Sequence, residues 1–202
     1  MGLASDLWSV GDTKDIIAGS ETLTMEIVGF NHDQLVSGGY AGISLGLRDL
    51  MQERRQINPV NTNMGSFVSS DLYSYLNETL FLQFPPDLQS VIKPVYKKTS
   101  GGGLSPDVQT DEMKLFLFSL NEVYGPHEVS HVSNDEGAKY ARFTGDESRV
   151  KHRSSVAESW WVRSPYIDNT TMYHSIASNG AITGMTGGVA SAGLGICFGF
   201  CI

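Results

Sequence analysis

The two thiols of the chain, Cys197 and Cys201, stand four residues apart in the segment GLGICFGFCI. A pair of this kind suggests redox chemistry or part of a metal site. If residues 196–202 form a strand, the two side chains share one face, yet their Cα atoms are roughly 13 Å apart at about 3.3 Å per residue. A disulfide needs Cα atoms closer than about 7 Å, so the pair cannot bridge within one strand. We therefore expect two small buried hydrophobic residues, with a redox pair as the alternative.

Histidine and carboxylate groups offer a second kind of chemistry. His127 and His131 stand four residues apart beside acidic neighbours, a spacing that would hold a metal ion if a helix displayed it. Pro126 and nearby β-branched residues disfavour a helix, so a solvated loop is expected. His32 and Asp33 follow a predicted strand and are expected to satisfy backbone groups in a turn. The sequence therefore predicts no catalytic residue, no metal and no cofactor.

Composition and charge favour one globular domain. The 202 residues are 41% hydrophobic and 18% charged, which supplies enough apolar side chain for a substantial core. A net charge of -8 argues against a nucleic-acid surface, because such proteins gather Lys and Arg. No apolar run has the length of a membrane span, and the first residues lack a basic flank followed by a hydrophobic stretch. We expect a soluble chain without membrane insertion.

Apolar patterns predict strands in the first two thirds of the chain. Residues 23–30 are rich in β-forming side chains, and residues 114–120 are apolar enough for a central strand. Residues 41–55 fit either a strand that runs into a helix or a helix alone. Residues 97–112 contain three consecutive glycines and are expected to form a flexible loop. Residues 121–159 are polar without a sustained period, so we expect a surface insertion there.

Two helices are predicted between these segments. In residues 70–80 the side chain of Ser70 can cap the helix, and apolar residues form one stripe along it. A shorter helix is expected to begin at Pro86 and to end before Pro94.

The segment WWVRSP, residues 160–165, alternates as a strand does. Trp161 and Arg163 would face one side of it and Trp160 the other, and Pro165 would end its pairing. We expect Trp160, Trp161 and Arg163 to be a buried scaffold, with direct stacking on a ligand as the alternative.

The last residues predict a hairpin and a buried strand. Residues 172–185 carry a hairpin pattern in which Asn179-Gly180 suits a type I′ turn. In residues 196–202, large apolar side chains alternate with Cys and Gly, so this strand belongs inside a sheet, with Phe198 and Phe200 as further scaffold residues.

Distinctive motifs occur in order along nearly the whole chain: WSVGDTKDI, IVGFNHD, PVNTN, FPPDLQSVIKPVYKKT, KLFLFS, WWVRSP and CFGFCI. Together they resemble a family of domains of unknown function found in tail proteins of phages and prophages of gut Firmicutes and in related bacterial surface proteins. That family is similar to the branch of the C-type lectin fold shared with formylglycine-generating enzymes and with variable proteins of diversity-generating retroelements.

The resemblance implies an α+β, C-type lectin-like fold with mixed or antiparallel sheets, two helices, long loops and a C-terminal strand buried in the sheet. One domain would cover residues 1–202, with a lead-in at residues 1–22 and a ligand-display region at residues 160–202. In the variable relatives, the fold holds a changeable surface near the C-terminus.

Retroelement diversification acts on adenines, and the Asn-type codons it alters do not yield Lys, Glu, Gln, Met or Trp. Between Tyr166 and Gly195 the single charged residue is Asp168, and Lys, Arg, Glu, Gln and Trp are absent. Met172 and Met185 would then be fixed scaffold positions. A loop-rich end of a β domain is also poor in long charged residues, so composition leaves both explanations open.

Residues of the kind found in adaptable binding surfaces are the expected ligand contacts. They are Tyr166, Asp168, Asn169, Thr171, Tyr173, His174, Asn179 and Thr183. Asp168 is the one carboxylate in this region, which disfavours a calcium-dependent site.

Three classes of function follow from these observations. The leading hypothesis is a non-enzymatic receptor- or ligand-binding module of a virion tail or bacterial cell surface, with a protein or glycan of a host or neighbouring cell as partner. The alternatives are a structural tail or assembly subunit and an oxidoreductase related to formylglycine generation. Avidity would favour a homo-oligomer or a tail-structure subunit.

Overall fold

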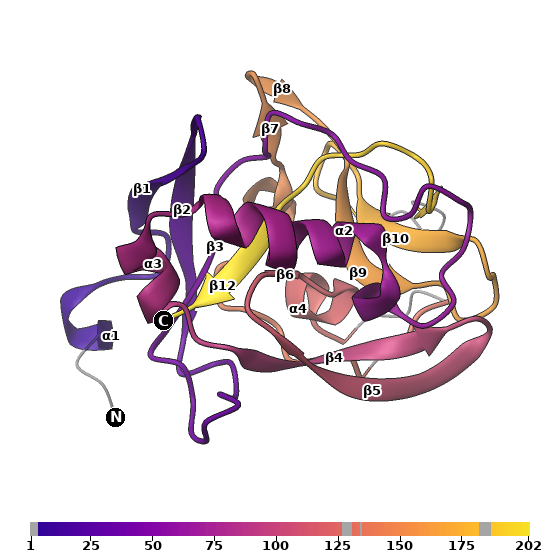
Figure 1. Ribbon diagram of the computed structural model, residues 1–202, viewed down its shortest axis with the longest axis horizontal. Helices are drawn as coiled ribbons and strands as arrows, with labels where there is room; N and C mark the ends of the chain where they lie inside the picture. The colour runs from indigo at the N-terminus through magenta and orange to yellow at the C-terminus, as the bar shows by residue number, and fades with distance from the viewer. Residues whose placement is uncertain (1–3, 127–130, 134, 182–186) are drawn as a thin grey trace.

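The computed structural model describes residues 4–126, 131–133, 135–181 and 187–202 (Figure 1). Within these ranges the strands form four sheets, and the strands paired within each sheet are antiparallel. The helices are short, and this mixture of antiparallel sheets with a few helices is compatible with the expected α+β class. No helix in the described ranges is long and apolar enough to cross a membrane.

The strands are β1 (Thr13–Ala18), β2 (Glu21–Phe30), β3 (Ile43–Leu47), β4 (Val95–Gly102), β5 (Ser105–Met113), β6 (Phe116–Leu117), β7 (His152–Arg153), β8 (Val156–Ala157), β9 (Trp160–Pro165), β10 (Met172–Ile176), β11 (Gly187–Val189) and β12 (Phe198–Cys201). The helical segments are α1 (Ala4–Leu7), η1 (Phe67–Ser69), α2 (Asp71–Ser74), η2 (Tyr75–Leu80), η3 (Phe81–Gln83), α3 (Pro86–Val91), α4 (Leu120–Tyr124) and η4 (Asp146–Arg149).

The largest sheet has the strand order β1-β2-β3-β12-β6, so the C-terminal strand lies in its interior (Figure 1). β12 pairs with β3 on one side, where Gly199 is opposite Gly46, and with β6 on the other, where Phe198 is opposite Leu117. Every residue of β12 is buried. The predicted burial of the last strand is therefore confirmed, and residues 43–47 form a strand and not a helix.

Residues 97–112 are not a loop, contrary to the sequence prediction. β4 and β5 form a long hairpin in which Val95 is opposite Met113, and Gly102 and Gly103 make its turn with φ of 65° and 60°. A Cβ on Gly102 would lie 1.9 Å from the carbonyl oxygen of Asn63, so only glycine fits there. The strand was missed because β4 turns polar side chains inward, which removes the usual alternation of apolar and polar residues.

Both predicted helices are present, and the first has mixed geometry. The Ser70 hydroxyl accepts a hydrogen bond from the backbone N–H of Tyr73, so the predicted cap is confirmed. The α-helical turn of α2 continues into a π-helical stretch, η2, and then a 3₁₀ turn, η3, while Leu72, Leu76 and Leu80 remain buried. α3 begins at Pro86, as predicted.

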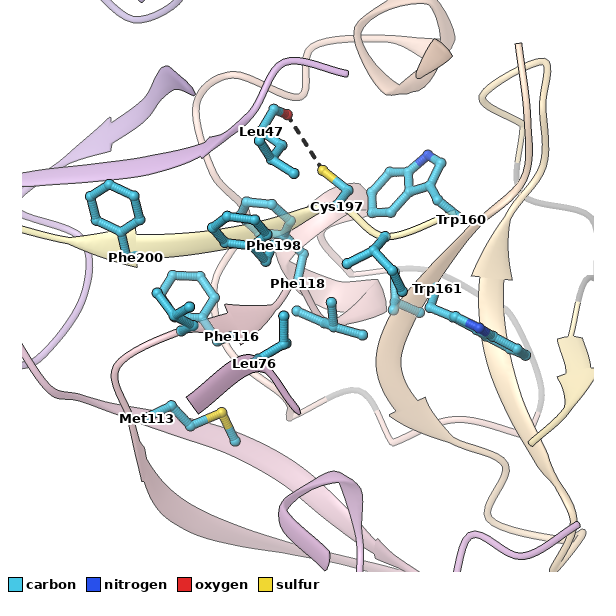
Figure 2. Close-up of a cluster of buried hydrophobic side chains, with 14 of the residues drawn as sticks. Leu47, Leu76, Met113, Phe116, Phe118, Trp160, Trp161, Cys197, Phe198 and Phe200 are labelled. Carbon is cyan, nitrogen blue, oxygen red and sulfur yellow. Dashed lines mark hydrogen bonds between the residues drawn. The ribbon is translucent and has the colours of Figure 1, made fainter. Parts of the chain in front are cut away.

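The two tryptophans of β9 belong to the core, as predicted. Trp160 and Trp161 are fully buried, and their indole N–H groups donate to the carbonyl oxygens of Arg149 and Arg55 at 3.0 and 2.9 Å. Figure 2 shows them at one end of a cluster that also contains Phe198 and other aromatic rings. All six residues of β9 are buried, so both faces of this strand are covered.

β9 also belongs to a three-stranded sheet of order β11-β10-β9. In this sheet Met172 pairs with Val189, which places the partner strand after the predicted Asn179-Gly180 turn. The antiparallel pairing of β10 with β11 confirms a hairpin, in which Asn179-Gly180 lies within the connection and the N–H of Gly180 closes a local turn on the carbonyl of Ala177 at 2.9 Å. The predicted two-residue connection was wrong, because β11 begins only at Gly187, and residues 182–186 of the connection lie outside the described ranges.

Residues 121–159 do not lie only on the surface. Besides α4, η4 and the β7–β8 hairpin, they contribute the buried side chains of Glu122, Glu136 and Tyr140. The expectation that this segment is a surface insertion holds only for part of it, because several of its polar residues are buried inside the molecule. The predicted lead-in, residues 1–22, likewise supplies β1 to the large sheet.

Candidate functional site

A cluster of charged side chains lies in the interior between the sheets. The Lys97 ammonium donates to Asp33 Oδ1 at 2.5 Å, to Glu122 Oε1 at 3.0 Å and to the Tyr140 hydroxyl at 2.7 Å. The Arg163 guanidinium donates to both carboxylate oxygens of Glu122, at 2.5 and 2.9 Å. All five side chains are at most 4% exposed. Such pairs persist in the interior because each charge has a partner and its remaining hydrogen bonds.

The pairing decides the charge of each carboxyl group. Burial acts to raise the pKa of Asp33 and of Glu122, but Lys97 beside Asp33, and Arg163 with Lys97 beside Glu122, hold both pKa values below their ordinary range. Glu136 differs, because burial raises its pKa and no cation touches its carboxyl group in the described residues. It accepts from the backbone N–H of Ser100 at 2.7 Å and contacts the Ser164 hydroxyl.

This internal charge cluster corrects the sequence prediction for residues 31–33. Asp33 does not simply complete a turn, since it pairs with Lys97 and accepts from the Tyr140 hydroxyl. His32 stacks on Tyr140 with ring centroids 3.8 Å apart. One sequence signal pointed to the cluster: Ser119-x-x-Glu122 is a capping box, and its glutamate turns inward. Because these side chains are closed from solvent, we assign them to the scaffold.

The cysteines are free and buried, as predicted. Cys197 Sγ donates to the carbonyl of Leu47 at 3.4 Å (Figure 2), and burial raises the pKa of this thiol to about 11. Cys201 Sγ lies 3.3 Å from Asp33 Oδ2 and 3.5 Å from Ser44 Oγ, and burial with the nearby Asp33 raises its pKa also. Thiolate chemistry requires a thiol that ionises near neutral pH, and the raised pKa values disfavour this for both cysteines.

The residues predicted to contact a ligand divide by burial. Tyr166, Tyr173 and His174 are buried at 6%, 0% and 3% exposure, so the prediction that they are displayed was wrong. Sequence composition could not reveal this burial. Asp168 and Asn179 are exposed. Asn169 and Thr171 are partly exposed, and Thr183 lies outside the described residues.

A stack of three rings connects the buried and exposed parts of this region. Tyr166 stacks on His174 with centroids 4.1 Å apart and an interplanar angle of 8°, and His131 stacks beyond Tyr166 at 5.8 Å. The outer ring, His131, pairs with the carboxylate of Asp168. His131 comes from a separate segment of the sequence, so its contacts with Tyr166 and Asp168 could not be anticipated.

Residues 167–171, here called the display loop, are held by several hydrogen bonds, and one residue, Asn63, supplies a group of them. Asn63 Nδ2 donates to the carbonyl oxygens of Tyr166, Asn169 and Met172 at 3.1, 2.7 and 2.9 Å. The backbone N–H of Asn63 donates to the carbonyl of Thr170 at 2.8 Å, and Asn63 Oδ1 accepts from the N–H of Gly103 at 2.9 Å. This set of bonds ties the loop to the turn between β4 and β5. We call it the Asn63 clamp.

Comparison with known proteins defines the family. The model of a domain of unknown function, DUF6273, matches residues 41–198. The chain belongs to the DUF6273 family. No curated protein and no solved structure matches it.

The DUF6273 match begins at residue 41, so it separates the first two strands from most of the remaining fold. Lys97, Glu122 and Arg163 of the internal charge cluster lie within the match, as do Asn63 and the display loop. Asp33, β1 and β2 precede it. The DUF6273 domain therefore contains the clamp and most of the charge cluster, and the N-terminal strands complete its large sheet.

Proposed function

We propose that this DUF6273 domain is a non-enzymatic ligand- or receptor-binding module, with a contact surface made by the display loop and His131. The observation that carries the proposal is the Asn63 clamp, which fixes a partly exposed polar loop to the buried Asn63 and to the turn between β4 and β5. A loop ordered before binding loses little conformational entropy when a partner docks. Asp168 and Asn169 supply acceptors and an amide, and the His131 ring supplies a flat contact area.

The state of the thiols favours this module over an oxidoreductase related to formylglycine generation. Such an enzyme needs an accessible, ionisable thiol pair, whereas Cys197 and Cys201 are buried with raised pKa values. A structural tail or assembly subunit is the second candidate, because the same rigid surface would suit a fixed subunit contact.

The biological setting proposed for the domain rests on the resemblance of its sequence motifs. We propose a C-type lectin-like fold in a phage tail or bacterial surface protein, with a protein or glycan of a host or neighbouring cell as the ligand. Retroelement diversification of residues 166–192 would then act on the display loop and on exposed residues such as Asn179. A tail tip carrying several copies would gain avidity from weak single-site contacts.

The proposal is tested by binding of the purified domain to a panel of intact gut Firmicutes cells and to a glycan array. The test variant carries Asp168→Ala with Thr170→Ala, and the matched control carries Glu78→Ala with Thr79→Ala on the exposed face of η2. Loss of binding in the test variant alone, with unchanged near-ultraviolet circular dichroism, is the expected result.

Equal binding by both variants would contradict the display loop as the contact surface. Absence of binding by the unaltered domain, combined with incorporation into a tail assembly, would favour the structural subunit.

A further inference from the structure

We propose that a second site, a polar cleft between β2 and the β7–β8 hairpin, binds a neutral saccharide. The cleft has a volume of about 470 Å³, within the range of small-molecule sites. Its polar walls come from the start of β2, from the residues after β3 and from the hairpin turn. The side chains used below are Glu21, Asp49, Gln52, His152, Ser154 and Ser155. The β7–β8 hairpin projects from the body of the molecule beside the long connection that follows β3 (Figure 1).

Hydrogen bonds between the three segments hold the cleft in shape without a ligand. The backbone N–H of Gln52 donates to Glu21 Oε1 at 2.8 Å, and the Ser154 hydroxyl donates to Gln52 Oε1 at 2.8 Å. The N–H of His152 donates to Asp49 Oδ1 at 2.9 Å, and the imidazole Nδ1 lies 3.3 Å from the same oxygen. The walls are thus preorganised, which lowers the entropy cost of binding.

Several polar groups of the cleft remain available to a ligand. Among the described residues no hydrogen bond engages the second carboxylate oxygen of Asp49, that of Glu21 or the Ser155 hydroxyl. The imidazole of His152 has its Nδ1 directed at Asp49, which leaves Nε2 for another partner. The cleft therefore offers both acceptors and donors at its surface.

The character of the lining selects the class of ligand. The residues that line the cleft include two carboxylates and neither Lys nor Arg, which disfavours phosphates and other anions. An ammonium ion donates hydrogen bonds but cannot accept them from Ser155 or His152. Sugar hydroxyl groups do both, and because Leu23, Leu47 and Leu50 at the cleft are almost fully buried, the contacts open to a ligand are mainly polar. A neutral saccharide satisfies both features.

The cleft and the display loop are independent surfaces built by different segments. The cleft uses residues 21–24, 47–52 and 152–155, and none of these belongs to the display loop or contacts it through the Asn63 clamp. A test of saccharide binding in this cleft is therefore independent of a test of the function proposed for the display loop.

The test is a ¹⁵N NMR titration of the full chain with glucose, galactose, mannose and N-acetylglucosamine. Glucose 6-phosphate serves as the anionic probe and glucosamine as the cationic one. At least one neutral sugar is expected to give saturable shifts at the amides of Gln52, His152 and Ser155. Its affinity should fall about tenfold or more in Asp49→Asn or Ser155→Ala, because each variant removes a hydrogen bond to the ligand. Asp87→Asn, an exposed carboxylate on α3, is the matched control and should bind normally.

Either of two results would overturn the proposal. One is the absence of saturable shifts at these amides with every neutral sugar. The other is binding of glucosamine or glucose 6-phosphate at least as tight as that of the best neutral sugar. If Asp49→Asn fails to fold, the Ser155→Ala variant, which removes only a hydroxyl in an exposed turn, still decides the question.

Discussion

Glu122 and Glu136 are both buried and lie in the same region of the interior, yet the pKa values of their carboxyl groups are shifted in opposite directions. Glu122 is paired with Lys97 and Arg163, which lower its pKa against the effect of burial. Glu136 has Ser100 and Ser164 as its carboxyl partners, and burial raises its pKa. The domain should therefore tolerate a neutral amide in place of Glu136 but not in place of Glu122.

We predict that Glu122→Gln lowers the free energy of unfolding by about 3–5 kcal/mol, because it leaves two buried cations short of an anion. Glu136→Gln should change the free energy of unfolding by less than about 1 kcal/mol, since burial favours an uncharged side chain at this position and no cation touches its carboxyl group in the described residues. Urea denaturation of both variants measures the difference. Equal losses would show that the two carboxyl groups share one charge state.

Acid should destabilise the domain through Asp33 and Glu122. Their folded pKa values lie below the ordinary values of 3.8 and 4.5, so their contribution is present above these values and is lost as the pH falls through the folded pKa. Glu136 acts in the opposite direction, because its raised pKa favours the folded state below pH 4.5. We expect the free energy of unfolding to fall below about pH 4.5, and less steeply in Glu122→Gln than in the unaltered chain.

The cysteines should be inert until the domain unfolds. Cys197 and Cys201 are buried with raised pKa values, so both access and thiolate formation are suppressed. Ellman's reagent at pH 8 is expected to label neither thiol in native protein and both in denaturant. Rapid labelling of the native protein would support the alternative hypothesis that the domain is a thiol-dependent oxidoreductase.

At the scale of elements, the Asn63 clamp makes one side chain a major contributor to the order of the display loop. Asn63→Ala would remove the amide donor to the carbonyls of Tyr166, Asn169 and Met172, of which Met172 keeps the N–H of Tyr166, and should cost about 2–3 kcal/mol, given the usual penalty for unpaired buried polar groups. Hydrogen exchange should accelerate at residues 166–172 more than in β12. Asn58→Ala is the comparison, since its amide serves the neighbouring Thr62 carbonyl instead. Uniform acceleration across the domain in Asn63→Ala would mean that the clamp supports the whole fold.

Several elements were predictable because their signals are local. The alternation of residues 196–202, the cap at Ser70 and the start of a helix at Pro86 each involve neighbouring side chains. The β4–β5 hairpin was missed because Lys97 points inward, and only a distant Asp33 explains why a lysine is tolerated there.

The candidate site was predictable only as a region. Composition drew attention to residues 166–195, but it could not separate the buried Tyr173 from the exposed Asp168. Asn63 and His131 are brought to this region from distant parts of the chain, and their contacts depend on the complete fold.

At the scale of the whole molecule, burial predicts where sister copies of the domain can differ. If a retroelement diversifies residues 166–192, differences should gather at exposed or partly exposed positions such as Asp168, Asn169 and Asn179. Tyr173 and Ile176, both fully buried, should remain constant. Sequencing the gene, its sister copies and the adjoining DNA checks this, and a nearby reverse transcriptase with a near-copy of the 3′ coding region should accompany the variation. Variation at Tyr173 equal to that at Asp168 would contradict it.

The interior position of β12 has a consequence for folding kinetics. The hydrogen bond from Cys197 to Leu47 joins residues 150 positions apart, so closing this sheet requires a very long chain loop. Folds dominated by such distant pairings acquire their native structure slowly. Until β12 inserts, β3 and β6 expose unpaired edges to other chains. Correct assembly of the sheet thus competes with aggregation, and dilute refolding should give a higher yield of native domain than concentrated refolding.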